Sequence, residues 1–275
     1  MSISFDVVIN SSEYAVDMKA GLETMQGVSD STRIISEAIC AGRVVKRQRT
    51  SSKLRTNMKE TFEGSYGQVF SVDFYDKATK DKFESIGEKT FIELIQHFIL
   101  VALYLDVPEL SSSATRILDE MGDNARQLVE QLRLSPLKKL HSIANKFDRT
   151  ITIRHRNANG NADMVASFNH GTSASLMTRR GRDVQVIEAA VTRFNINTGN
   201  GRLFLRNNPT LETVAFGFKD YKGIKVSHKR IFTENLNYNN GLSSDDWRYM
   251  RLAVYPEHTR DGRIVRYMIS RIHEE

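Results

Sequence analysis

The chain has one cysteine, four prolines and no long uncharged apolar run. Cys40 alone cannot form an internal disulfide, so a disulfide scaffold is excluded and the composition fits a reducing cytosol. The most apolar stretch, residues 91–105, includes Glu93, Gln96 and His97. As a helix it would span about 22 Å, short of the roughly 30 Å of bilayer hydrocarbon. The first ten residues lack the features of a signal peptide. We therefore expect a buried core helix, no membrane partner and a cytoplasmic protein.

Catalytic and metal-binding motifs are also lacking. No HExxH, Walker or GxSxG motif occurs, and the seven histidines have neither paired spacing nor a nearby cysteine. We therefore predict no catalytic residue, no metal site and no cofactor. One arrangement could place two carboxylates and a lysine around Mg²⁺, namely Glu212 followed by Asp220 and Lys222. A Mg²⁺-dependent nuclease is the third-ranked function on this basis.

The pattern of residues 1–148 predicts an α+β domain that opens with a β-α-β unit. Residues 3–9 alternate as a strand does, Asp17 can cap a following helix, and Gly42 can end that helix. Residues 66–75 are rich in aromatic and β-branched side chains, which indicates the next strand.

Three further helices follow in the predicted order. The core helix over residues 91–105 precedes a single helix over residues 114–133, and a short helix with Pro136 in its first turn comes last. The helix over 114–133 carries an apolar stripe at three-four spacing, formed by Leu118, Met121, Ala125, Leu128 and Leu132. This stripe needs a partner helix, so we expect the helical domain to serve assembly, with itself as a homo-oligomer or with a partner protein.

From residue 149 the pattern changes to short strands and turns. Residues 149–182 predict short strands and a linker or mobile loop, and residues 183–275 predict a small barrel. The strands of the barrel are expected at residues 184–197, 202–206, 213–218, 224–226, 249–255 and 264–272. The fold class is therefore α+β, with a β-rich C-terminal domain that forms an OB-like or SH3-like barrel, because closure removes edge strands.

Positive charge is concentrated in the second half of the chain. The net charge is +6, but residues 1–150 hold 20 Lys or Arg against 21 Asp or Glu, whereas residues 151–275 hold 19 against 12. Fifteen of those 19 are Arg, whose planar fork matches phosphate oxygens in pairs. This balance favours a phosphate-bearing or nucleic-acid partner.

A basic run without any acid lies between residues 43 and 59. It consists of Arg43, Lys46, Arg47, Arg49, Lys53, Arg55 and Lys59. Three interpretations are open: a loop that contacts phosphates, a hairpin whose charges are matched by acids elsewhere, and a partly disordered segment. The first half has enough acids outside the run to neutralise it.

Two other groups of residues are candidates for nucleic-acid contacts. The first is the loop that precedes the barrel, with Arg179, Arg180 and Arg182. The second lies on the barrel and consists of Arg193, Arg202, Phe204 and Arg206. Strand alternation puts the last three of these on one face, so we expect Phe204 to face solvent among charges. A protein-binding surface is the main competing interpretation.

Three segments carry a resemblance to known sequences. They are FDVVIN at residues 5–10, AGLETMQGVSDSTRII at residues 20–35 and EGSYGQVFSVDFY at residues 63–75, followed by a barrel. This arrangement resembles uncharacterised bacterial and prophage-encoded proteins. The resemblance implies a bacterial or mobile-element setting and assigns no residue a role.

The favoured function is non-enzymatic binding of nucleic acid through its backbone, by the Arg-rich barrel with help from the basic run. The second-ranked function is that of an interaction subunit of a bacterial defence or mobile-element system, which would use the same arginines against an acidic protein.

Overall fold

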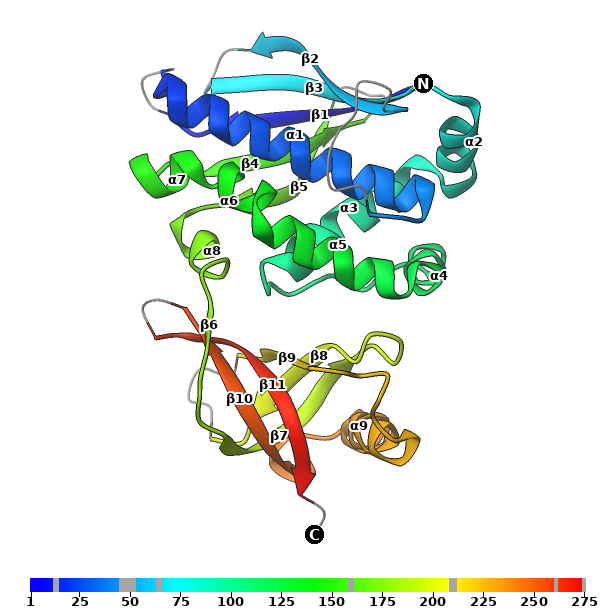
Figure 1. Ribbon diagram of the computed structural model, residues 1–275, viewed down its shortest axis with the longest axis vertical. Helices are drawn as coiled ribbons and strands as arrows, with labels where there is room; N and C mark the ends of the chain where they lie inside the picture. The colour runs from blue at the N-terminus through cyan, green and yellow to red at the C-terminus, as the bar shows by residue number, and fades with distance from the viewer. Residues whose placement is uncertain are drawn as a thin grey trace. The chain divides into compact units, whose positions relative to one another are not determined.

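The protein divides into two compact units, Met1–Leu176 and Met177–Glu275, in the computed structural model (Figure 1). The structure describes residues 1–11, 15–44, 53–62, 66–157, 161–207, 212–259 and 262–273. The predicted α+β class is confirmed, because the first unit combines helices with one sheet and the second contains a barrel. In the described part of the chain, no helix is long and apolar enough to cross a bilayer.

The first unit contains a five-stranded sheet with the order β2-β3-β1-β4-β5. Its strands are β1 (Ser2–Ile9), β2 (Leu54–Phe62), β3 (Tyr66–Phe74), β4 (Ile151–Arg156) and β5 (Ala162–Phe168). All four pairings are antiparallel. One face of the sheet is apolar, since Phe5, Phe70 and Ile153 belong to the core of this unit. Residues 151–168 therefore complete the sheet that the N-terminus begins.

Helices cover the apolar face of this sheet (Figure 1). The helices of the first unit are α1 (Met18–Ala41), α2 (Lys77–Ile86), α3 (Glu88–Ala102), α4 (Ser112–Met121), α5 (Asp123–Leu134), α6 (Pro136–Leu140), α7 (Ser142–Phe147) and α8 (His170–Ala174), and α1 and α3 contact the sheet. The ends of α1 agree with the prediction: the side chain of Asp17 accepts a hydrogen bond from the Ala20 amide, and Gly42 ends the helix at φ 63°. In α1, Gly27 allows close packing on α6, because a Cβ there would lie 2.1 Å from the Leu140 nitrogen.

The prediction of one helix over residues 114–133 is wrong. Gly122 has a φ of 51° and a ψ of −123° and separates α4 from α5, because a residue with these angles cannot continue a right-handed helix. The stripe from Leu118 to Leu132 is buried in the core of its own unit. This stripe is therefore no assembly surface, and assembly through another surface stays a prediction.

A buried histidine connects α6 to α8. The Nδ1 of His141 lies 2.6 Å from the Leu137 carbonyl oxygen, and its Nε2 lies 2.8 Å from the Thr172 hydroxyl. A carbonyl oxygen can only accept, so Nδ1 carries the proton of the neutral ring. Burial lowers the pKa of His141 from 6.5 to about 4, against a smaller upward effect of the Leu137 hydrogen bond.

We expect the first unit to lose stability between pH 6.5 and pH 4. In this range the unfolded chain protonates His141 and the folded chain does not, so acidification favours unfolding by about 3 kcal/mol at most. Urea unfolding followed by helical circular dichroism measures this loss. In a His141→Gln variant the loss should be smaller by about that amount, whereas an equal loss in both proteins would contradict the prediction.

The second unit is a closed five-stranded barrel. Its strands are β7 (Gln185–Phe194), β8 (Gly201–Leu205), β9 (Val214–Phe218), β10 (Met250–His258) and β11 (Ile264–His273), and the two-residue β6 (Arg179–Arg180) pairs with the last two residues of β10. The strands follow the order β11-β9-β8-β7-β10, and β10 pairs again with β11 to close the ring. Only the β9–β11 pair is parallel among these pairs.

A helix, α9 (Val226–Asn239), connects β9 to β10, and the short 3-10 helix η1 (Ser244–Asp246) follows it. The unit thus has the connectivity of an OB-type barrel. The strands β7, β8 and β9 form a meander, α9 follows, and β10 and β11 form a final hairpin in which β11 runs parallel to β9. The predicted strand at residues 224–226 is wrong, because α9 begins at Val226. This helix buries Phe232, whose ring lies 5.1 to 5.6 Å from those of Phe194, Phe216 and Phe218.

Candidate nucleic-acid interface

Three arginines lie in one row across the outside of the barrel. Arg193 of β7 is paired with Arg202 of β8, Arg202 with Ala215 of β9, and Ala215 with Arg266 of β11. Directly paired residues of neighbouring strands point to the same face of a sheet. That face is the outside, because the next residues of β8, β9 and β11, namely Leu203, Phe216 and Tyr267, belong to the barrel core. We call these four residues, Arg193, Arg202, Ala215 and Arg266, the arginine row.

Beyond Arg266, the same line of paired residues continues with an acid, Glu257, and one more arginine, Arg180. Arg266 is paired with Glu257 of β10, and Glu257 with Arg180 of β6. The guanidinium of Arg180 lies 4.4 Å from the centre of the Tyr255 ring. The loop arginines predicted as candidates are therefore partly ordered, since Arg179 and Arg180 form the strand β6, and both they and Arg182 are exposed.

Neighbouring polar groups hold two arginines of the row in place. The Nε of Arg202 donates to the Thr213 hydroxyl at 2.6 Å, and its Nη2 donates to the Thr213 carbonyl oxygen at 2.5 Å. The Nη2 of Arg266 donates to the Asn200 side-chain oxygen at 2.7 Å. Asn200 precedes β8 in the β7–β8 loop, where Gly199 takes a φ of 70°. Both guanidiniums are thus oriented before any ligand binds.

Two of the predicted barrel residues lie differently from expectation. The expected solvent exposure of Phe204 is wrong, because only 9% of its surface is exposed and its ring packs edge-on against Trp247 at 5.4 Å. Arg206 forms an ion pair with Glu188 at 3.1 Å, and its guanidinium lies 5.4 Å from the Tyr249 ring. This neutralised arginine lies outside the arginine row.

The described part of the basic run lies in the first unit, and two of its lysines face acids. Lys53 forms an ion pair with Asp76 at 2.8 Å, and Lys59 lies 3.9 Å from Asp73. The hydrogen bond from Lys53 is the largest cause that lowers the pKa of Asp76 to about 2. Lys53 and Lys59 thus agree with the interpretation of a hairpin matched by acids.

Arg55 is paired with Asp73 across β2 and β3. The guanidinium of Arg55 lies 5.7 Å from the centre of the Tyr75 ring, and Arg43 is exposed just after α1. The other predicted residues of the run, Lys46, Arg47 and Arg49, lie outside the described residues.

The structure places one carboxylate of the nuclease hypothesis, that of Asp220, in a local turn. Asp220 accepts a hydrogen bond from the Gly223 amide at 3.2 Å, which is the geometry of a local turn. Among the residues that the structure describes, no group of three His, Cys, Asp or Glu side chains could hold a metal ion.

Sequence reasoning missed Arg266, the third cation of the row. Alternation within residues 264–272 distinguishes Arg266 from the core residue Tyr267, so its outward direction was available from the sequence. The sequence did not show that Arg266 lies beside β9, because the parallel pairing of β11 with β9 exists only in the closed barrel.

Comparisons with known proteins gave no match: no family model, no curated protein and no solved structure is similar to this chain. The barrel and its arginine row are therefore the basis for considering function.

Proposed function

We propose that the barrel binds nucleic acid through the phosphate backbone, by means of the arginine row. The observation that carries this proposal is the cross-strand alignment of Arg193, Arg202 and Arg266 on the outer face of the barrel. Together the three guanidiniums concentrate positive charge on this side of the barrel, and such a surface attracts an anionic ligand. The second and third strands of OB-type barrels form the face that binds oligonucleotides, and Arg202 and Ala215 lie on the corresponding strands β8 and β9.

The chemistry of the row favours backbone contacts over recognition of bases. Guanidiniums match phosphate oxygens two at a time, and phosphate contacts carry no sequence information. Stacking of bases needs exposed aromatic rings, whereas the aromatic residue of β8, Phe204, is buried against Trp247. We therefore expect binding that depends on strand length and salt rather than on sequence.

The charge of the second unit supports the same ligand. Residues 177–275 hold 17 Lys or Arg against 11 Asp or Glu, so the unit attracts polyanions from a distance. An acidic protein partner would meet the same field, but the even spacing of a phosphodiester chain fits a linear row of guanidiniums better than irregularly placed carboxylates do.

The proposal is tested by titrating fluorescent single-stranded oligonucleotides of 5 to 30 nucleotides, and duplexes of equal length, with the full chain. We expect binding at 50 mM salt that tightens with length. If three phosphates of a single strand are held, affinity should fall about 20-fold between 50 and 200 mM salt. Absence of binding at 50 mM salt, or affinity independent of salt, would overturn the proposal and favour an acidic protein as the partner.

A further inference from the structure

We infer that one phosphate of the bound strand lies on Ala215, between Arg202 and Arg266. This inference rests on the proposed function and names the position where the backbone comes closest to the sheet. Ala215 is the one member of the arginine row with a single methyl as its side chain, and it is partly exposed. The row therefore presents two long cations with a short residue between them.

The spacing of the strands fits one phosphate at this position. Ala215 lies on β9, and its direct neighbours Arg202 and Arg266 lie on β8 and β11, on either side. Neighbouring strands are about 4.8 Å apart, so the two arginine backbones are about 10 Å apart with Ala215 midway. The long side chains of Arg202 and Arg266 can turn toward a phosphate centred over the methyl group of Ala215, each from its own side.

The two arginine side chains bend away from Ala215 in opposite directions along β9. Arg202 is bonded to Thr213, two residues before Ala215, while Arg266 lies over Gly217, two residues after it. These two contacts lie on either side of Ala215 along β9. Cations on both sides of this short, partly exposed side chain offer a phosphate two charge partners.

Gly217 explains how Arg266 takes up this position. A Cβ at Gly217 would lie 2.1 Å from the Nη2 of Arg266 and 2.7 Å from the Asn200 side-chain oxygen, so only glycine leaves room for this pair. Glycine weakens the middle of a strand, and here it permits the approach of a guanidinium to the backbone. The glycine, the asparagine and the arginine thus form one arrangement that holds positive charge beside Ala215.

The test compares Ala215→Leu with Ala215→Ser in the oligonucleotide titration. Leucine would occupy the position of the phosphate, so we expect affinity at 100 mM salt to fall about tenfold. The slope of log K against log salt should fall in magnitude by about 0.7, the value for one phosphate of a single strand. Serine keeps the space and should bind within twofold of the unchanged protein. Val186→Leu, at an exposed position of β7 outside the row, controls for added bulk.

Each outcome decides the inference. If the Ala215→Leu variant binds with the same affinity and the same salt slope as the unchanged protein, the inference is overturned. The proposed function still stands in that case, because the unchanged protein binds. Failure of the unchanged protein to bind would remove both. Emission of Trp247 reports whether the variant barrel is folded. If leucine unfolds it, Gly217→Ala serves instead, since the added Cβ displaces Arg266: a loss of at least threefold supports the inference, and unchanged affinity overturns it.

Discussion

Replacement of Arg193, Arg202 and Arg266 by glutamate in one chain is expected to lower nucleic-acid affinity on the order of 100-fold or more at 100 mM salt. Each arginine supplies a charge-assisted contact of about 1 kcal/mol, and 1.4 kcal/mol corresponds to a factor of ten. Introduced carboxylates also repel the phosphates. The titration with a single-stranded oligonucleotide measures the effect, and the salt dependence of any remaining binding should be weaker.

A matched variant separates the arginine row from the overall charge. Lys225, Arg230 and Arg251 are exposed cations of the same unit outside the row, and their change to glutamate alters the net charge equally. At 150 mM salt the screening length is about 8 Å, so this variant should bind within about threefold of the unchanged protein. Equal losses in the two triple variants would contradict a specific role for the row. The triple change to glutamine tests the row without introducing acids.

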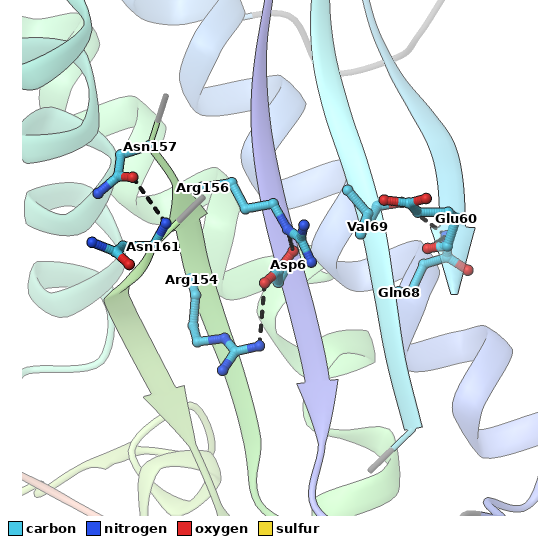
Figure 2. Close-up of polar contacts among 8 residues, drawn as sticks. All are labelled: Asp6, Glu60, Gln68, Val69, Arg154, Arg156, Asn157 and Asn161. Carbon is cyan, nitrogen blue, oxygen red and sulfur yellow. Dashed lines mark hydrogen bonds and ion pairs between the residues drawn. The ribbon is translucent and has the colours of Figure 1, made fainter. Parts of the chain in front are cut away.

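Replacement of Asp6 by alanine is expected to destabilise the first unit by about 3 kcal/mol. Only 1% of Asp6 is exposed, on the face of the sheet opposite the apolar core, and its carboxylate lies between two arginines of β4 (Figure 2). Arg154 donates to one oxygen at 3.2 Å and Arg156 to the other at 2.6 Å. The Phe62 ring lies 5.8 and 5.4 Å from these guanidiniums.

The size of this effect follows from what the substitution leaves behind. Loss of one member of a buried charge pair typically costs about 3 to 5 kcal/mol, because the remaining charge keeps its desolvation cost without its partner. Arg154 and Arg156 have side chains that are 33% and 34% exposed, so water compensates in part and the lower end applies. Arg154→Ala should cost less, since Asp6 would keep Arg156.

Urea unfolding followed by circular dichroism at the helical band measures the change, because α1 to α8 lie in the first unit. The single tryptophan, Trp247, lies in the second unit, so its emission reports on the barrel and should show an unchanged midpoint. Asp163→Ala, at an exposed carboxylate of β5, is the control and should change stability by less than about 0.5 kcal/mol. An Asp6→Ala variant as stable as this control would contradict the structural role of the carboxylate.

Local chemistry predicted most of the secondary structure. Asp17 and Gly42 delimit α1 as expected, because a cap and a left-handed end are properties of the adjoining backbone. The helix α9 was missed because its apolar residues are few, and Phe232 gains its burial only from the rings of distant strands. Gly122 was predicted to be part of a helix, although it takes a positive φ that ends α4.

The candidate site was predicted only in part. Arg193 and Arg202 were named as candidates, but their alignment with Arg266 depends on strands that are separated by up to about 70 residues in sequence. Phe204 was expected to be exposed because strand alternation points its side chain out of the barrel. Alternation does not show whether another segment covers that side chain. Here Trp247 of a later segment covers it.

The sequence by itself determined the α+β class, the barrel in the second half, the positions of most strands and the excess of arginine there. These properties follow from hydrophobic period, turn residues and composition, all of which are local. Only the tertiary structure decided which charges are neighbours. Closure of the barrel aligns Arg193, Arg202 and Arg266, while ion pairs neutralise Arg206 and Lys53, because the distance between two charges is set by strand register and packing and not by their separation along the chain.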